Sequence, residues 1–185
     1  MRILAISGSL RARSSNTELL RAAALVSPTV FAVELYAELG ALPHFNPDLD
    51  HESAVPPDSV ARLRAQVGAA DAVLISSPEY AHGVPGSLKN VLDWLVSAPE
   101  MYHKPVGLLT ASGASAHGPA ALEEILRTMS TQVVPAASRV VALNGRRLDA
   151  AQILEDTALT DVLREVLEAL RAAVTSPAAL ESRSP

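Results

Sequence analysis

The sequence contains no cysteine among its 185 residues. Disulfide bonds, thiolate nucleophiles and cysteine-ligated metals are therefore excluded. Any redox chemistry has to come from a bound cofactor. The absence of cysteine is also typical of a cytosolic protein, because disulfides form in oxidising compartments.

Excess positive charge and long apolar runs are missing as well. The formal net charge is −5, whereas nucleic-acid-binding proteins usually carry a basic face. No stretch approaches the roughly 20 apolar residues that span a bilayer, and no signal-peptide pattern is visible. We expect a cytoplasmic protein that binds neither nucleic acid nor a membrane.

Hydrophobic residues are plentiful, at 49% of the chain, which indicates a folded globular protein. The length suits one domain with one substantial core. No repeat or interdomain linker is apparent. We expect a single domain over residues 1–174, followed by a polar, proline-containing flexible tail over residues 175–185.

Apolar runs alternate with amphipathic segments along the chain. Strands are expected at residues 3–6, 30–36, 71–77 and 106–110, and a fifth at 133–141 with an interruption at Pro135. Helix N-caps are expected at Ser15 or Asn16, at Asp58 or Ser59, at Ser87, and at Asp149 or Asp156, and Pro119 is expected as the first residue of a further helix. Five strands alternating with five helices predict a doubly wound α/β fold with a parallel sheet. At this size we expect the flavodoxin-like order 2-1-3-4-5, with a ligand between strands 1 and 3.

The loop after the first strand, residues 8–17, is rich in hydrogen-bond donors. It holds four hydroxyl side chains, one asparagine and two arginines, and it opens a helix. Backbone N–H groups and the helix dipole attract an anion there, and an arginine fork suits phosphate oxygens. The loop lacks both G-x-G-x-x-G and G-x-x-x-x-G-K-[ST]. It predicts a site for a terminal monophosphate without a metal; the alternative is a solvated loop with ordinary helix capping.

Two further loops are expected at the same edge of the sheet. In residues 78–86, proline stiffens the backbone and glycine opens it, so the loop suits the edge of a flat heterocycle. Tyr80 is a candidate to lie against a ring face; the alternative is that Tyr80 packs into the core and Glu79 is solvated. The loop at residues 110–115 has small side chains that let a ligand approach, although small residues are also common in any tight turn.

Other chemistries are less well supported. No pair of the five histidines has the spacing of a helical zinc site. Most histidines are expected on the surface, but His82 and His117 fall on loops at the ligand end. The stretch Gly113-Ala114-Ser115-Ala116-His117 approaches the G-x-S-x-G of serine hydrolases and ends in histidine instead of glycine. A hydrolase using Ser115 and His117 therefore remains an alternative.

Two motifs resemble those of the NADPH-dependent FMN reductase family. They are Gly8-Ser9-Leu10-Arg11-x-x-Ser14-x-Asn16, and Pro78-Glu79-Tyr80 with Pro85-Gly86-x-Leu88-Lys89-Asn90-x-x-Asp93-Trp94. The family contains quinone, chromate and azo-dye reductases on a flavodoxin-like fold. The resemblance implies FMN as cofactor, NADPH or NADH as co-substrate, no metal and no catalytic side chain.

The resemblance also implies a set of cofactor-binding residues. Ser9, Arg11, Ser14, Asn16 and Thr17 would hold the FMN phosphate; Pro78, Glu79, Tyr80, Ala81, His82 and Gly83 would line the isoalloxazine; and Ser112 and Gly113 would touch its other edge. Two departures stand out. Ala81 replaces the asparagine of many relatives, which removes one hydrogen bond. Residues 116–120 lack the usual arginine, which weakens the expected NADPH contact or favours NADH.

The activity implied by the resemblance is a two-step electron transfer. Hydride passes from nicotinamide to flavin N5, and then to a small-molecule acceptor such as a quinone, a flavin, an azo compound or a metal oxyanion. The alternatives are a non-catalytic flavin-binding electron carrier and a flavin-free regulatory module. A carrier usually has more aromatic residues than the 3% found here.

Self-association is the last expectation, because relatives of this kind are usually homodimers or homotetramers. The helix after the second loop is apolar around much of its circumference. Leu88, Leu92 and Leu95 are expected to face the sheet, and Val91 and Trp94 to face a second subunit.

Overall fold

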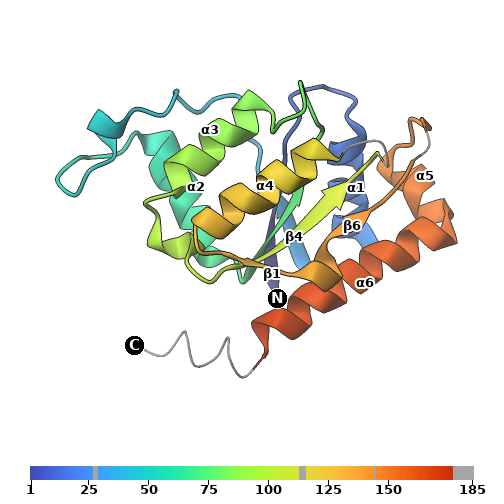
Figure 1. Cartoon of the computed structure of the whole chain (residues 1–185). Helices are drawn as coiled ribbons and strands as arrows, with labels where there is room; N and C mark the ends of the chain where they lie inside the picture. Colours follow the sequence, from blue (N-terminus) through green and yellow to red (C-terminus); the bar gives the residue numbers. More distant parts are fainter. Residues whose placement is uncertain (27–28, 113–115, 144, 177–185) are drawn as a thin grey trace.

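The computed structural model describes residues 1–26, 29–112, 116–143 and 145–176. A parallel sheet forms its centre, in the order β2-β1-β3-β4-β5 with β6 also beside β4 (Figure 1). The strands are β1 (Arg2–Ser7), β2 (Ala32–Leu35), β3 (Ala72–Ser76), β4 (Pro105–Thr110), β5 (Gln132–Val133) and β6 (Arg139–Val140). The predicted flavodoxin-like order 2-1-3-4-5 is confirmed.

The predicted fifth strand is divided into β5 and β6 at Pro135, where an interruption was expected. Pro135 opens a short 3-10 helix, η3 (Pro135–Ala137), and β5 and β6 on either side both pair in parallel with β4. Proline has no N–H to give to a strand ladder, so the chain leaves the sheet there and returns. Gly107 of β4 permits the detour, because a Cβ on it would lie 3.0 Å from the Ala137 carbonyl oxygen.

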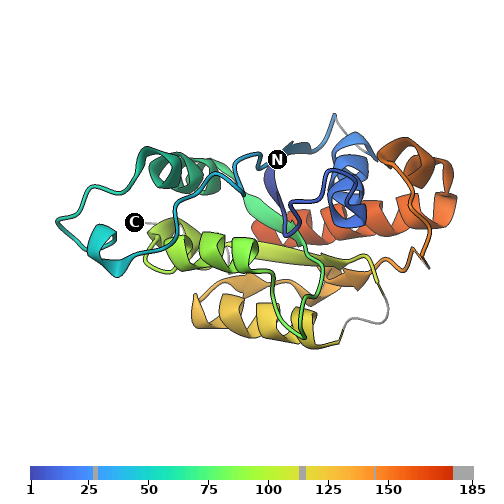
Figure 2. The same cartoon turned by 90° about the horizontal axis from the view of Figure 1, so that it is seen from above.

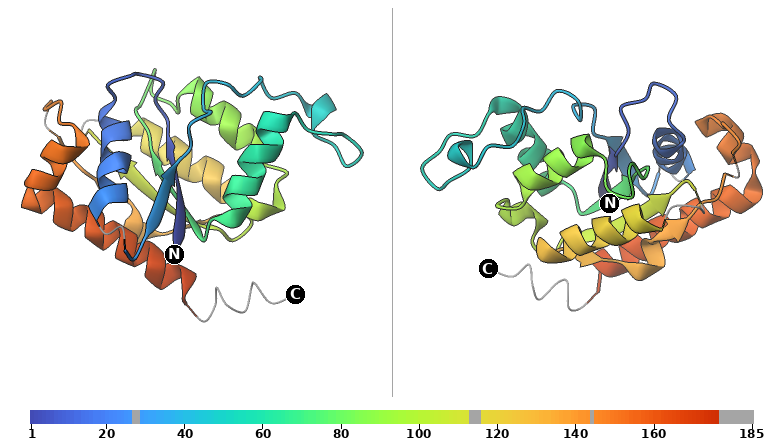
Figure 3. Two further views of the ribbon diagram at one scale, coloured as in Figure 1. Left: turned by 180° about the vertical axis from the view of Figure 1, so that it is seen from behind. Right: turned by 45° about the horizontal axis from the view of Figure 1, so that its top comes forward.

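Helices cover both faces of the sheet. They are α1 (Ser15–Val26), α2 (Asp58–Ala69), α3 (Gly86–Leu95), α4 (His117–Thr128), α5 (Ala150–Glu155) and α6 (Thr157–Val174). Side chains alternate along β1, so Leu4 and Ile6 pack under α2, α3 and α4, whereas Ile3 and Ala5 pack under α1, α5 and α6. Figure 3 shows α1 and α6 on the rear face. Within the described ranges, no helix is both long and apolar enough to cross a membrane.

Three expected helix starts are wrong. Ser87 lies inside α3, Asp58 is the first residue of α2, and Pro119 is the third residue of α4. The N-caps of α2 and α3 are Pro57 and Pro85, which have no side-chain donor or acceptor. Their carbonyls accept the first helical N–H groups instead, from Val60 and Ala61 and from Lys89. An extended proline therefore starts these helices without a polar cap.

The last predicted helix is in fact two helices. Asp149 caps α5 by accepting the Gln152 N–H at 2.9 Å, and the Gln152 side chain accepts the Asp149 N–H at 3.0 Å. Asp156 then ends α5 and caps α6 by accepting the Leu159 N–H at 3.2 Å. Both candidate caps are used, so the described chain has six α-helices and not five.

The long loop between β2 and α2 covers Trp94. The indole Nε1 donates to the Pro43 carbonyl at 2.9 Å, and the Phe45 ring meets the indole edge-on, with centroids 5.1 Å apart. Val91 and Trp94 are fully buried within one chain, as are Leu88, Leu92 and Leu95. The expectation that Val91 and Trp94 face a second subunit is therefore wrong. Farther along, the loop extends away from the body of the molecule (Figure 2).

Candidate functional site

The loop after β1 is held against the end of β3. Gly8 N–H donates to the Ser76 carbonyl at 2.8 Å, and the buried Ser76 hydroxyl donates to Asn16 Oδ1 at 2.9 Å. A Cβ on Gly8 would lie 2.4 Å from Ser77 Oγ, so only glycine permits this close approach. The two loops that carry the sequence motifs are therefore adjacent.

Hydroxyl groups line the inside of the first loop. Ser7 and Thr17 share a hydrogen bond of 2.8 Å, and Ser9 Oγ accepts the Arg11 N–H at 3.3 Å. Ser9 and Ser14 are buried, and Ser14 directly precedes α1, where helix N–H groups concentrate positive potential. Donors of this kind suit a phosphate monoester.

The second loop makes a tight reverse turn. Tyr80 and Gly83 exchange two backbone hydrogen bonds, of 3.1 and 2.9 Å. The two residues between them are left-handed, with φ of 49° at Ala81 and 59° at His82, as in a type I′ turn. Tyr80 is 50% exposed. The alternative in which it packs into the core is wrong, and its ring remains available to a ligand.

Glu79 joins the second loop to the start of α4. Its Oε2 accepts the Gly118 N–H at 2.8 Å, and the backbone N–H groups of Gly118 and His117 lower the pKa of this carboxyl. Gly118 makes room, because a Cβ there would lie 3.0 Å from both Cβ and Cγ of Glu79. Nearby, the His82 and His117 rings stack with centroids 4.5 Å apart. Glu79 is therefore a fixed contact between two loops, and the alternative of a merely solvated side chain is wrong.

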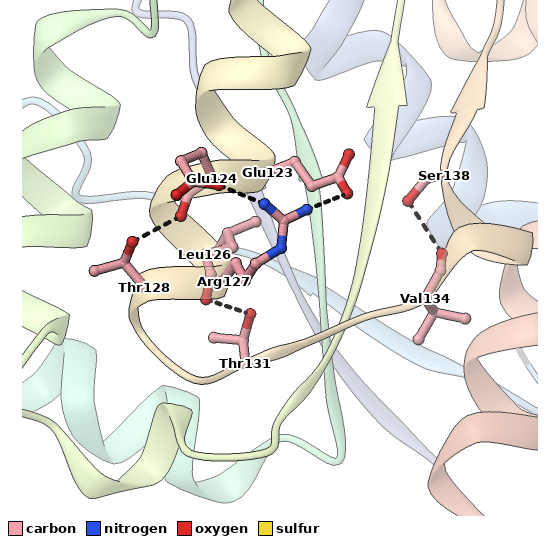
Figure 4. A network of polar contacts seen from close by, with 8 residues as sticks. All are labelled: Glu123, Glu124, Leu126, Arg127, Thr128, Thr131, Val134 and Ser138. Atoms are coloured by element: carbon pink, nitrogen blue, oxygen red, sulfur yellow. Dashed lines mark hydrogen bonds and ion pairs between the residues drawn. The ribbon is translucent and has the colours of Figure 1, made fainter.

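The outer face of α4 carries a separate polar network (Figure 4). Arg127 pairs with Glu123 at 3.0 Å and with Glu124. Thr128 and Thr131 donate to the carbonyls of Glu124 and Leu126, both at 3.0 Å. Arg127 is the one arginine in the α4 sequence, so this helix brings no uncompensated arginine to the site.

The residues named from the sequence fall at one edge of the sheet. Ser9, Arg11, Ser14, Asn16 and Thr17 follow β1, residues 78–83 follow β3, and Ser112 follows β4. Gly113 and Ser115 lie outside the described residues. Ser7, Ser76 and Gly118 hold the loops together but were not predicted from the sequence. Ser7 and Ser76 could have been recognised, because each is a hydroxyl residue at the end of an apolar strand. In the described part of the chain, no group of three or more His, Asp or Glu residues is arranged to hold a metal ion.

Known proteins resemble this chain over most of its length. The family model for NADPH-dependent FMN reductase matches residues 1–145. An NAD(P)H-dependent FMN reductase of Pseudomonas aeruginosa is 31% identical over 176 residues, covering 92% of this chain and 94% of that protein. A quinone reductase of Pseudomonas putida is 31% identical over 172 residues, covering 90% and 89%. The solved structure of FerB, a flavoenzyme NAD(P)H:(acceptor) oxidoreductase from Paracoccus denitrificans, superposes with a TM-score of 0.71 at 25% identity, covering 93% of this chain and 98% of FerB.

Proposed function

Because this chain belongs to the NADPH-dependent FMN reductase family, we propose that it uses FMN to pass electrons from NADPH or NADH to a small-molecule acceptor. The observation that carries the proposal is the donor-lined first loop, fixed to the end of β3 beside an exposed second loop. The relatives compared above are named as FMN and quinone reductases, so we propose a quinone as the first acceptor to test.

The first loop has the composition that an FMN phosphate needs. Ser9, Arg11, Ser14, Asn16 and Thr17 would hold the phosphate, because they offer hydroxyl, amide and guanidinium donors at the positive end of α1. The nearest acid in the sequence, Glu18, is engaged by Arg21 at 2.5 Å and by the Ala150 N–H at 3.0 Å. Nothing in this donor set opposes a doubly charged phosphate.

The second and third loops would hold the ring system. Residues 78–83 present a rigid turn to one edge of the isoalloxazine, and Ser112 and Gly113 would meet the other edge. When bound, FMN supplies the acceptance of hydride and its transfer onward. Glu79 is ionised and bonded to α4, so it accepts hydrogen bonds and does not donate a proton. The protein's part is binding and orientation, with no side chain acting as acid or base.

We further propose that residues 1–174 form one FMN-binding domain. The two hydrophobic clusters pack on opposite faces of the same sheet, so neither face is covered without the helices of the other half of the chain. For self-association as a homodimer or homotetramer, we propose a surface that we call the α3 edge: Leu49, Val96 and Tyr102, which are 41%, 60% and 63% exposed. Leu49 and Val96 directly precede Asp50 and Ser97, whose side chains share a hydrogen bond of 2.7 Å.

The test of the proposed function is an absorbance spectrum of the purified, FMN-supplemented and desalted protein. NADPH and then NADH are added without oxygen. A yellow protein that bleaches with either nucleotide supports the reductase and identifies the donor. A yellow protein that stays oxidised indicates the electron carrier instead, and a colourless protein overturns the assignment of FMN.

A further inference from the structure

The arginines of this protein divide into two groups. Within the described residues, eight form ion pairs with carboxylates: Arg2, Arg21, Arg62, Arg64, Arg127, Arg146, Arg164 and Arg171. Four others form none there: Arg11, Arg13, Arg139 and Arg147. All four follow β1 or lie in or after β6, toward the carboxyl end of the sheet. Among the described residues, the arginines without an ion pair therefore lie toward the end of the sheet where the candidate site lies.

Two of these arginines line the same pocket. Arg13 and Arg147 border a space of about 40 Å³ together with Ser14 and Ser15, between the start of α1 and the loop before α5. Figure 2 shows this loop and α5 beside α1 at the edge of the sheet. We call this space the Arg13–Arg147 pocket. Because Ser14 belongs to both, this pocket adjoins the proposed site for the FMN phosphate.

Two carboxylates, those of Glu18 and Asp149, also line the Arg13–Arg147 pocket, and both accept hydrogen bonds from groups other than Arg13 and Arg147. Glu18 accepts from Arg21 and from the Ala150 N–H, and Asp149 caps α5 through the Gln152 N–H. The guanidinium groups have no such partner in the described structure. An arginine pair with uncommitted donors is a good receptor for a phosphate group, because its planar N–H forks match the phosphate oxygens.

This pocket is distinct from the proposed site for the FMN phosphate. That site is formed by the side of the first loop that faces β3, where Asn16 meets Ser76. The Arg13–Arg147 pocket is bordered from the side of α5, and Ser14 is the one residue that the two sites share. FMN has a single phosphate, and a quinone acceptor has none. The nicotinamide dinucleotides have a diphosphate, and NADPH has a 2′-phosphate in addition.

We infer that the Arg13–Arg147 pocket binds a phosphate group of the nicotinamide dinucleotide that delivers the electrons. The inference rests on the proposed function. The arginine of α4 is paired with Glu123 and Glu124, so the donor's phosphates need another cation near the flavin, and this pocket supplies two. Arg13 and Arg147 are therefore residues that determine the affinity for the donor.

The test compares Arg147→Ala and Arg13→Ala with the FMN-loaded wild-type protein. Binding of NADP⁺ and of NAD⁺, which do not reduce the flavin, is measured by titration calorimetry, and KM and kcat are measured with NADPH and NADH. We expect the Kd for NADP⁺ to rise about tenfold, the loss of about 1.4 kcal/mol from one charge-assisted contact. The KM for NADPH should rise with kcat unchanged. Arg147→Lys should recover part of the affinity, because it keeps the charge without the fork.

The two nucleotides identify which phosphate is bound. If only NADP⁺ binding weakens, the pocket holds the 2′-phosphate; if NADP⁺ and NAD⁺ weaken together, it holds the diphosphate. Arg164→Ala, which removes an exposed arginine paired with Asp161 on α6, is the matched control and should change neither. Arg11→Ala should instead weaken FMN retention with the fold intact, because Arg11 belongs to the FMN site.

Two results would overturn the inference. One is unchanged binding of both nucleotides in Arg13→Ala and Arg147→Ala. The other is a loss of FMN in these variants comparable to that in Arg11→Ala, which would make the pocket part of the flavin phosphate site. Failure of the proposed function looks different, because the wild-type protein itself would then fail to bind FMN or to be reduced by either nucleotide.

Discussion

At the scale of single residues, Ala81 has a left-handed backbone conformation that is unfavourable for alanine. A left-handed conformation costs an ordinary L-residue roughly 1–2 kcal/mol, whereas asparagine and glycine adopt it more readily. The asparagine that many relatives have at this position was expected to matter for a hydrogen bond to the flavin. The φ of 49° supplies a second reason, which lies in the turn itself.

We predict that Ala81→Asn stabilises the protein by about 1 kcal/mol, because it relieves the left-handed strain. Urea unfolding of the two proteins measures the difference. Ala41→Asn is the control, because Ala41 is an exposed turn residue without a positive φ. If Ala81→Asn is no more stable than Ala41→Asn, the turn does not store the strain that its dihedral angles indicate.

Glu79 gives a prediction about pH. The Gly118 N–H bond lowers its pKa in the folded protein. Its contribution to the free energy of unfolding is therefore complete above the ordinary pKa of 4.5, and it is lost as the pH falls through the folded pKa. Glu79→Gln keeps an acceptor oxygen but loses the charge. We expect Glu79→Gln to be less stable than wild type at pH 7 and to lose less stability than wild type does on acidification.

Urea unfolding at several pH values between pH 7 and pH 3 measures this difference. Glu123→Gln, on the exposed face of α4, is the control and should follow the wild-type curve. Parallel curves of stability against pH for wild type and Glu79→Gln would show that the charge of Glu79 does not stabilise the folded protein.

Candidate donors for the site could be named from residue identity, but the contacts that hold them in place could not. Ser9, Asn16 and Tyr80 could be named because hydroxyl, amide and ring chemistry can be read from the sequence. The bond from Gly118 to Glu79 joins residues 39 positions apart, and no local pattern encodes such a pair. The same is true of Gly8, whose need for glycine depends on where Ser77 lies.

At the scale of elements, Arg64 of α2 joins the long loop to the end of α3. Its guanidinium donates to the Trp94 carbonyl, to Ser97 Oγ and to Asp50 Oδ1, the last at 2.6 Å. The Asp50 side chain is only 7% exposed. Burial opposes its ionisation, but the bonds from Arg64 and Ser97 outweigh burial and lower its pKa. Arg64 therefore holds both a helix C-terminus and an otherwise extended loop.

We predict that Arg64→Ala lowers the free energy of unfolding by about 1–3 kcal/mol, because it leaves a mostly buried carboxylate without its charged partner. Limited proteolysis should also cut residues 51–56 faster. Arg62→Ala is the matched control: its partner Glu38 is more exposed, so we expect a clearly smaller loss than in Arg64→Ala. Equal losses in the two variants would mean that the network around Asp50 is no stronger than a surface ion pair.

Element boundaries were predicted less well than the elements themselves. Apolar runs located β1, β3 and β4 because these strands are buried, and Asp149 and Asp156 were recognised because a carboxylate can cap a helix. The starts of α2 and α3 were misplaced because a proline carbonyl accepts the first helical N–H groups there, without any polar side chain. A cap without a side-chain signal cannot be distinguished from the residues around it.

At the scale of the whole molecule, the sheet order followed from alternation and chirality, but the surface did not. Trp94 on an apolar helix looked like a subunit contact. The loop that covers it contains Pro43, whose carbonyl accepts the Trp94 N–H and which lies 51 positions earlier in the chain. Only the folded chain shows that this helix is covered from within. A contact between subunits has to use residues that remain exposed after the loop is in place.

The α3 edge is the surface that meets this condition, and Val96 is its most direct test. A carboxylate at the centre of an apolar contact loses hydration without gaining a partner, so Val96→Asp should shift the protein toward the monomer. Sedimentation velocity at several concentrations measures the shift. Val30→Asp is the control, because Val30 is 47% exposed and lies before β2, outside the α3 edge. If Val96→Asp associates as wild type does while Val30→Asp dissociates, subunits meet through the β2 side of the sheet, and the apolar residues near Val96 have another role.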